Sequence, residues 1–324
     1  MIANELQARM HEGLLNAQKT CFACGSDLLT PIHEGFFSLG LCLTDPEVAP
    51  TLAPYEGKRF TLNCCRECGF IQAEGIPADP NYFNALYSQK WSEEWMLNDF
   101  DSTYKDDIFR GILKEVGRHI QRSSKKLLDV GTHVGKMIYL ASQAGWLADG
   151  IELNPLTREI AIRKTGRPVH RVTAKELAST GVKYDAITIT DVLEHIPDPV
   201  SILTDLRLML KPGGVIAIKV PSGRNQLRKE KIRVLFGMTE KAEIGTNFIH
   251  VNHFSPTALK RALIRAGFVQ PRVTVGAPEL PPGGGLRGLL SRCFRTSVFW
   301  VARLPGGVHT PLGLNLQAYA SAPS

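Results

Sequence analysis

The stretch of residues 125–154, KKLLDVGTHVGKMIYLASQAGWLADGIELN, decides the fold. It opens with the apolar run 126–130, which we expect to be a buried parallel strand. A turn with two glycines, residues 131–135, leads into a helical pattern of apolar side chains. A second strand-like run, residues 147–153, ends near the acidic Glu152. Strand, glycine turn, helix and strand with a terminal acid form the βαβ unit that binds nucleotides in α/β sheets.

The glycines and acids of this turn indicate what it binds. Gly131 allows the backbone to turn tightly and to approach a ligand, and Gly135 allows the helix to pack on the strand. Glu152, at the carboxyl end of the next strand, can accept both hydroxyls of a ribose. A dinucleotide site would carry G-x-G-x-x-G, whereas this turn has Asp129 two residues before the first glycine and His133 between the two. An ordinary αβ turn of another doubly wound protein is the alternative from this turn alone.

A second motif lies in residues 184–199, YDAITITDVLEHIPDP. Its strand-like run ends at Asp191, and an acid and an imidazole, Glu194 and His195, follow at the strand's carboxyl end. Open α/β sheets bind their ligands at that edge. Residues 211–214, KPGG, then precede another strand-like run.

Together the two motifs resemble motif I, D-x-G-x-G-x-G, and the D-V-L-E-H region of class I S-adenosylmethionine-dependent methyltransferases. His133 stands where that family often has its middle glycine. The resemblance covers most of residues 20–275. It implies an α/β fold with a Rossmann-like, seven-stranded doubly wound sheet, and S-adenosyl-L-methionine as the cofactor.

The resemblance also implies which residues form the site. Cofactor contacts are expected from Asp129, Gly131, Thr132, His133, Gly135, Glu152, Leu153, Thr173, Asp191 and Val192. Thr173 is included because the acid that relatives often carry after the third strand is missing here. The groups expected to handle the acceptor's proton are His195, Glu194, His250 and His253, since imidazole titrates near neutrality. His195 is the first choice because the motif fixes its position, and each of these histidines has a purely structural role as its alternative. Three tyrosines of the preceding segment are candidates for the pocket wall, with packing of the helix there on the sheet as the alternative for each: Tyr82, Tyr87 and Tyr104.

Two C-x-x-C-G knuckles about 40 residues apart predict a zinc site. The ligands would be Cys21, Cys24, Cys65 and Cys68. Four thiolates close a tetrahedral shell, so the site should be structural; reduced cysteines in a small β core are the alternative. Cys64 ranks below Cys65 because only Cys65 keeps the spacing. Cys42 and Cys293 have no partner at ligand spacing, and we expect both to be buried.

These features divide the chain into four parts. They are a zinc-binding, ribbon-like module at 1–78, a helical lid or linker at 79–122, a methyltransferase core at 123–276, and a C-terminal insertion with the final strand at 277–324. Within them we expect a short polar helix over 1–20 and antiparallel strands over 35–60. A packed insertion is expected over 286–304, in preference to a helix that covers the pocket or one that lies on a membrane surface, and a final antiparallel strand is expected over 314–322.

Length and composition limit the remaining possibilities. The 324 residues are 44% hydrophobic and 21% charged, as in an ordinary globular protein. No apolar run reaches the ~18 residues that span a bilayer, and the N-terminus lacks a signal-peptide pattern. Cysteines spaced as metal ligands indicate a reducing compartment, so we expect the protein in the cytoplasm.

The net charge of +7 predicts an anionic partner, such as a nucleotide-linked sugar, a nucleic acid or an acidic membrane surface. The leading hypothesis is methylation of a small molecule, a nucleotide- or lipid-linked sugar, because a cysteine module before a D-V-L-E-H core resembles bacterial sugar C-methyltransferases. The alternatives are an RNA base methyltransferase and a non-catalytic scaffold whose zinc module binds a protein.

Overall fold

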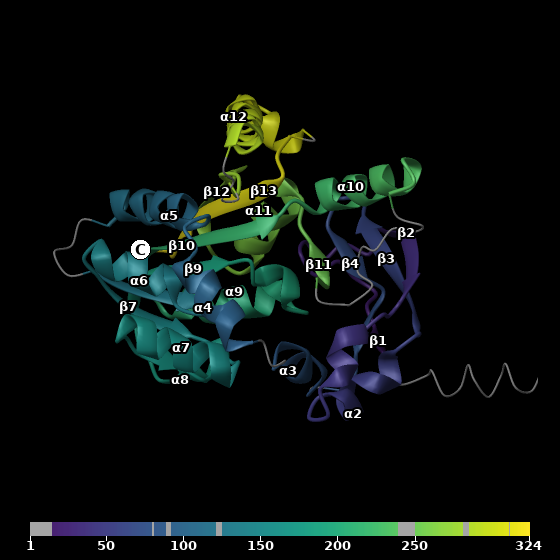
Figure 1. The fold of residues 1–324 in the computed structure, drawn as a ribbon, viewed down its shortest axis with the longest axis horizontal. Coiled ribbons are helices and arrows are strands. Elements are labelled where there is room, and N and C mark those ends of the chain that lie inside the picture. The colour runs from purple at the N-terminus through teal and green to yellow at the C-terminus, as the bar shows by residue number, and fades with distance from the viewer. Residues whose placement is uncertain are drawn as a thin grey trace, which may run out of the picture.

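A seven-stranded sheet in the order β12-β13-β10-β9-β6-β7-β8 forms the centre of the protein (Figure 1). The structure is a computed structural model that describes residues 15–79, 81–88, 92–120, 125–238, 250–280, 285–310 and 312–324. The strands are β6 Lys125–Val130, β7 Trp146–Ile151, β8 Val169–His170, β9 Tyr184–Thr190, β10 Leu210–Pro221, β12 Val269–Val275 and β13 Asn315–Ser321. β13 pairs antiparallel with both β10 and β12, as expected for a final strand at 314–322. The five strands β10, β9, β6, β7 and β8 pair in parallel.

Helices cover both faces of this sheet. The helices of the core are α5 Asp106–Arg118, α6 Lys136–Gln143, α7 Pro155–Thr165, α8 Ala174–Ser179, α9 Pro199–Leu208, α10 Gly223–Leu235 and α11 Pro256–Arg265. The apolar sides of α5 and α6 pack in one buried cluster and those of α8, α9 and α11 in another, on opposite faces of the sheet. This arrangement confirms the predicted Rossmann-like doubly wound fold.

Three helices of the core begin with the same local signal. Asn154, Asp198 and Ser255 each accept hydrogen bonds from backbone N–H groups of the following turn, and each is followed by proline. A capping side chain satisfies donors that the helix leaves free, and proline has no donor to lose at the first position. The caps of α7 and α9 fix where these helices begin at the sheet edge that carries the site, and the cap of α11 fixes where that helix follows residues 252–253 of the smaller sheet.

The N-terminal part forms a smaller sheet in the order β11-β4-β3-β2. Its elements are β1 Leu15–Ala17, β2 Leu29–Phe36, η1 Gly40–Thr44, α2 Ala49–Leu52, η2 Ala53–Tyr55, β3 Arg59–Cys65, β4 Ile71–Ala73, β5 Gly75–Pro77 and β11 Asn252–His253. β11 comes from far along the chain and pairs with β4, so this sheet is joined to the core by strand pairing. Phe37, Tyr55, Phe60 and Leu62 pack in its own core.

Two predictions for this part need correction. Residues 35–60 were expected to be strands, but between β2 and β3 the chain forms the short helices η1, α2 and η2, whose buried Leu52 and Tyr55 pack on the sheet. A helix was expected over 1–20, but β1 at Leu15–Ala17 pairs with β5; the rest of that prediction, residues 1–14, lies outside the described residues.

The expectation of a packed insertion at 286–304 is also wrong. α12, Gly285–Ala302, stands away from the sheet at the top of Figure 1, followed by η4 Gly307–His309. Its large apolar side chains face solvent, and Cys293 on it is exposed instead of buried. Cys42 belongs to the side chains that the structure does not describe. Among the described helices, none combines the length and the apolar character needed to cross a membrane.

Candidate functional site

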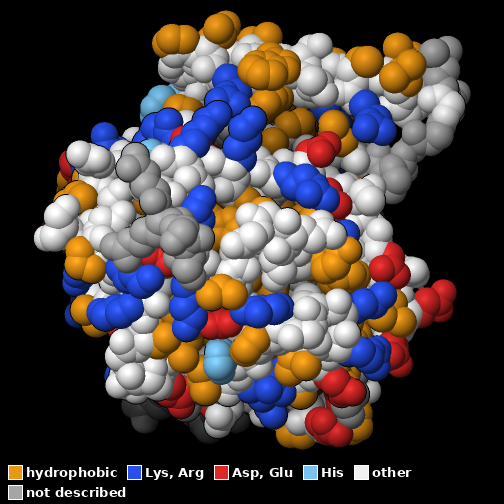
Figure 2. All heavy atoms as spheres, turned by 90° about the vertical axis from the view of Figure 1, so that its left-hand side faces the viewer, with side chains coloured by type: hydrophobic (Ala, Val, Ile, Leu, Met, Phe, Trp, Pro, Cys, Tyr) orange, Lys and Arg blue, Asp and Glu red, His pale blue; other side chains and the backbone are white. Residues whose placement is uncertain are grey.

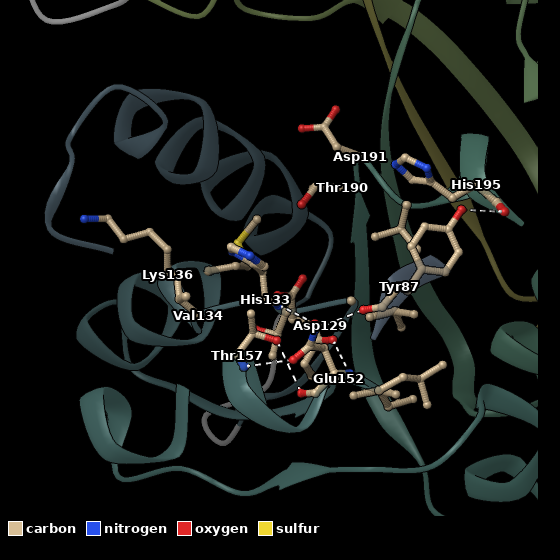
Figure 3. A pocket seen from close by; sticks show the side chains of 18 of the residues that line it. Tyr87, Asp129, His133, Val134, Lys136, Glu152, Thr157, Thr190, Asp191 and His195 are labelled. Carbon is tan, nitrogen blue, oxygen red and sulfur yellow. Dashed lines mark hydrogen bonds between the residues drawn. The ribbon is translucent and has the colours of Figure 1, made fainter. Parts of the chain in front are cut away.

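A cavity of about 580 Å³ opens at the carboxyl ends of β6, β7 and β9 (Figure 3). The chain runs from β6 to β7 and β8 on one side and then crosses over to β9 on the other. Ligands of open α/β sheets bind at such a switch point. Two short helices, α3 Asn81–Tyr87 and α4 Glu93–Asp101, contribute residues to the cavity wall opposite the sheet.

The glycine turn forms one end of the cavity. Gly131 has a φ of +69°, and a Cβ there would lie 2.4 Å from Cγ2 of Val192. Its N–H and that of Thr132 both donate to the Ile151 carbonyl, at 2.9 and 3.0 Å. The turn is therefore closed against β7, and the Val192 side chain packs directly on Gly131, where a side chain would not fit.

Gly135 does not reach the cavity. A Cβ there would lie 2.9 Å from Thr165 and 3.0 Å from Ala161, both in α7. Its role is close packing of the turn against α7, instead of the expected packing against a strand or contact with a cofactor.

Glu152 is held in place by two backbone donors. Its Oε2 accepts the N–H of His133 at 2.8 Å, and its Oε1 accepts the N–H of Asn154 at 2.8 Å. The carboxylate lies beside the glycine turn and lines the cavity, as does the neighbouring Leu153. Each oxygen keeps a free lone pair for a ligand hydroxyl.

Two non-glycine residues with positive φ also line the cavity, His133 at 51° and Asp191 at 54°. Such backbone conformations are uncommon outside glycine and gather at functional sites. The imidazole Nδ1 of His133 lies 3.3 Å from the Asp99 carboxylate of α4. His133 therefore joins the glycine turn to the opposite wall of the cavity.

Asp129 lies at the base of the same end (Figure 3). Its carboxyl is buried and accepts a hydrogen bond from the Thr188 hydroxyl at 2.7 Å. Burial raises the pKa of Asp129 to about 7. Asp129 therefore binds part of a proton near neutral pH and orders the start of the turn.

Thr173 lines the cavity together with Val172 and Ala174. Its hydroxyl is occupied, because it forms a capping box with Glu176 at the start of α8. A ligand at this wall would therefore meet its backbone and methyl group.

His195 lies at the other end of the cavity, in the short helix η3, Leu193–His195. The Tyr87 hydroxyl donates to its backbone carbonyl at 3.3 Å, and the Tyr87 ring meets its imidazole edge-on at 5.6 Å. The His250 ring packs edge-on against the imidazole at 4.7 Å. These contacts hold the imidazole at the cavity wall next to Asp191 (Figure 3).

Glu194 lies behind His195 and does not line the cavity. It is 2% exposed, and its Oε2 has no hydrogen-bond partner among the described residues. Burial, with a smaller contribution from Asp191, raises the pKa of Glu194 well above its ordinary value. Glu194, His195 and His250 each place a ligand atom within 4.8 Å of the others, close enough to share a divalent cation or a polar group of a ligand.

Two predicted site residues lie elsewhere. His253 is buried in β11 with its Nδ1 3.0 Å from the Gln226 side-chain oxygen, and burial lowers its pKa to about 3. It is a structural histidine, since it does not touch the cavity. Tyr82 is buried against Tyr55 in the N-terminal core, whereas Tyr87 and Tyr104 line the cavity as expected.

The sequence reasoning missed Lys219, which is 2% exposed in β10. Its ammonium lies 2.7 Å from the Asp191 carboxylate and 3.0 Å from that of Glu279. Burial alone would lower its pKa, but the two carboxylates raise it, so Lys219 stays charged. A single lysine inside the apolar run VIAIKV was the signal, because a buried lysine needs anionic partners.

The four predicted zinc ligands come together in the N-terminal part. The sulfurs of Cys21 and Cys68 are 3.6 Å apart, as are those of Cys24 and Cys65, and all four lie within 4.8 Å of one another. Zinc–sulfur bonds in a tetrahedron place sulfurs about 3.8 Å apart. The Cys64 thiol instead donates to a backbone carbonyl, so the donor set fits zinc with Cys65 as the ligand.

Comparisons with known proteins agree with this geometry. The family model described as "Methyltransferase domain" matches residues 100–270, just over half of the chain. The ubiquinone biosynthesis O-methyltransferase of Haemophilus ducreyi is 32% identical over 123 residues, covering 35% of this chain and 51% of that protein. The enzyme of the same name from Hydrogenovibrio crunogenus is 30% identical over 144 residues, covering 43% of this chain and 58% of that protein. The chain thus spans about half the length of the curated relatives it matches.

Many solved structures resemble the fold, among them two methyltransferases. Haemonchus contortus phosphoethanolamine N-methyltransferase 2, in complex with phosphomonomethylethanolamine and S-adenosylhomocysteine, has a TM-score of 0.51 at 15% identity, covering 78% of this chain and 63% of that one. The methyltransferase bound to the Haloferax volcanii Trm112 activator has a TM-score of 0.50 at 14% identity, covering 73% of this chain and 100% of that one. At such low identity the likeness shows the fold alone.

Proposed function

Because the chain belongs to the methyltransferase-domain family, we propose that it transfers a methyl group from S-adenosylmethionine to a small acceptor molecule. The observation that carries the proposal is the Glu152 carboxylate, which two backbone N–H groups hold beside the turn at Gly131. A carboxylate fixed in this way can accept the two hydroxyls of a ribose, and the group attached to that ribose would lie along the backbone of the turn.

The other cofactor contacts in this proposal follow the cavity wall. His133 and Thr132 offer the backbone of the turn, Asp191 and Val192 face it from the end of β9, and Thr173 offers its backbone. S-adenosylmethionine supplies a methyl group on a positively charged sulfur that is already a good leaving group. The chain must therefore align the acceptor and remove its proton.

We assign the proton transfer to the imidazole of His195. It lies at the cavity wall, and the rings of Tyr87 and His250 fix its orientation. Burial and the neighbouring His195 lower the pKa of His250 to about 4, so His250 is neutral at pH 7 and can accept a hydrogen bond. Glu194, whose raised pKa favours the protonated form, acts as a positioning residue behind them.

The acceptor we favour carries a hydroxyl that becomes methylated. The names of the curated relatives, ubiquinone biosynthesis O-methyltransferases, support oxygen as the methylated atom. A nucleotide- or lipid-linked sugar is the second candidate, because the cysteine module in front of the core is the feature shared with sugar C-methyltransferases. The net charge of +7 suits an anionic acceptor in either case.

Calorimetric titration with S-adenosylmethionine tests the proposal. We expect binding by the natural protein and, for Glu152→Gln, a loss of about 10- to 100-fold in affinity, because a charged acceptor of hydrogen bonds is removed. Glu159→Gln, on the exposed side of α7, is the matched control. Absence of binding by the natural protein would favour the non-catalytic scaffold. RNA binding that weakens steeply with salt would favour the RNA base methyltransferase.

We further propose that Cys21, Cys24, Cys65 and Cys68 hold one structural zinc ion within a module spanning residues 1–78. The sulfur separations of 3.6 Å support this, and four thiolates leave no position for a substrate. The module would precede a linker at 79–122, a core at 123–276 and the C-terminal part at 277–324.

Metal analysis of paired variants tests the zinc site. We expect about one zinc per chain in the natural protein and in Cys64→Ser, and well under one in Cys65→Ser, with a lower unfolding temperature for Cys65→Ser alone. Equal zinc content in both variants would contradict the assignment.

A further inference from the structure

α12 exposes a continuous apolar surface. Its exposed large apolar residues, together with the one that follows the helix, are between 53% and 70% exposed. We call them the α12 stripe: Leu289, Leu290, Phe294, Trp300, Val301 and Leu304. A water-facing helix normally carries polar side chains at such positions. Apolar surface gathered in this way marks a site of interaction.

The stripe lies on the side of α12 that faces away from the protein. At 3.6 residues per turn its six positions fall within an arc of about 140°. Ala302 is buried and Val298 and Phe299 are half-buried, so these residues form the side turned toward the protein. Figure 1 shows α12 standing above the sheet, and Figure 2 shows hydrophobic side chains along the same upper edge of the molecule.

The charges around the stripe are all positive. Residues 280–324 contain four arginines and neither aspartate nor glutamate. Arg292 lies on the flank of the helix beside the stripe, and the Arg303 guanidinium stacks over the Trp300 ring at 5.7 Å. Arg295 lies on the side turned toward the protein, where it donates to the Glu279 carbonyl. Figure 2 shows Lys and Arg side chains just below the apolar edge. An apolar helix face bordered by arginines is typical of helices that lie in a membrane interface.

We propose that α12 docks on an anionic membrane surface, with the stripe in the boundary between headgroups and acyl chains and Arg292 and Arg303 at the lipid phosphates. A bilayer with anionic lipids supplies both an apolar layer and the negative charge that the segment lacks. A second copy of the chain fits less well, because two stripes face to face would bring their arginines together with no acid in residues 280–324 to neutralise them.

A short chain of contacts joins α12 to the cavity. Arg295 donates to the backbone carbonyl of Glu279 at 3.3 Å, and the Glu279 carboxylate pairs with Lys219. Lys219 also pairs with Asp191, which lines the cavity. Docking by α12 thus holds the site close to the bilayer. Resting on the proposed function, this favours an acceptor carried on a lipid.

Co-sedimentation with lipid vesicles tests the docking. We expect the natural protein to bind vesicles in which about one third of the phosphatidylcholine is replaced by phosphatidylglycerol, and to bind pure phosphatidylcholine weakly. The double variant Phe294→Glu/Trp300→Glu should lose at least about tenfold in partition, because two anchors are replaced by charges. Ile264→Glu, at a 52% exposed apolar position of α11, is the matched control and should bind as the natural protein does.

A second variant keeps the proposal open to refutation if the first folds poorly. Arg292→Gln/Arg303→Gln retains the stripe and should reduce binding to the anionic vesicles by about tenfold or more, with weaker salt dependence. Equal binding by all variants would overturn the proposal. So would a dimer, seen by light scattering, that Phe294→Glu/Trp300→Glu dissociates. S-adenosylmethionine titration of the same samples separates the two proposals, since vesicle binding without cofactor binding would refute only the enzymatic one.

Discussion

The two ends of the cavity are built in different ways. The end at Gly131 is made mainly of backbone, with Glu152 held by N–H groups of its own βαβ unit. The end at His195 is assembled from side chains of segments far apart in the chain, since Tyr87 and His250 pack on the same imidazole. A cofactor shared by many enzymes suits a site made of backbone, whereas a particular acceptor needs a site made of side chains specific to this chain. Loss of a residue should therefore affect cofactor affinity at one end and turnover at the other.

The largest effect should follow from His195→Ala. Removal of a general base costs about 100- to 10,000-fold in turnover, while the affinity for S-adenosylmethionine should stay within about twofold, because the glycine turn is untouched. Methyl-transfer assays and calorimetry on the same sample check this. His119→Ala, which removes an exposed histidine at the end of α5, is the control.

Partial recovery of turnover with added imidazole would distinguish a base from a packing role. Full turnover in His195→Ala, combined with its loss in His250→Ala, would move the base to His250.

The second largest effect is expected on cofactor affinity, at the Gly131 end of the cavity. Gly131→Ala places a Cβ 2.4 Å from Val192 Cγ2 at a φ of +69°. Val192 is β-branched and cannot turn aside easily, so we expect about 100-fold weaker binding of S-adenosylmethionine. Gly145→Ala has the same left-handed strain at +81° but no atom within 4 Å of the new Cβ. Calorimetry that finds equal affinity in the two variants would show that the close packing of Val192 on Gly131 does not shape the cofactor site.

The same contrast explains how much could be predicted from the sequence. The glycine turn, Glu152 and the sheet follow from local patterns, because their contacts lie within one βαβ unit. The acceptor end does not, since the proximity of His250 to His195 depends on how residues 250–254 return to the N-terminal sheet through β11. The prediction that His253 belongs to the site is wrong for the same reason: a shift of one residue along a strand decides whether a side chain faces a cavity or a core.

The prediction that residues 286–304 pack against the protein is wrong for a different physical reason. The apolar content of α12 is the same whether its residues pack inward or face outward, and composition cannot tell the two apart. Only the buried Ala302 and the exposed Phe294 show which side faces the protein.

The smallest expected effect is on how the free energy of unfolding depends on pH, and it differs between the two ends of the cavity. The pKa of Asp129 is about 7 in the folded protein and about 3.9 when unfolded. The folded state then binds the extra proton, so this group makes the free energy of unfolding fall as pH rises from about 4 to about 7. His250 has the opposite sign. Its folded pKa of about 4 lies below the unfolded value of about 6.5, so its contribution is lost as pH falls through that window.

The two contributions oppose each other in the natural protein, and single variants separate them. Asp129→Asn should make stability rise more steeply with pH, and His250→Asn should make it rise less, each by up to about 1.4 kcal/mol per pH unit. Urea unfolding at several pH values between about 4 and about 7 measures both slopes. Asp107→Asn, which removes an exposed carboxylate of α5, corrects for the loss of a carboxyl as such. Slopes that change in the same direction would show that the two ends do not differ in protonation as the structure indicates.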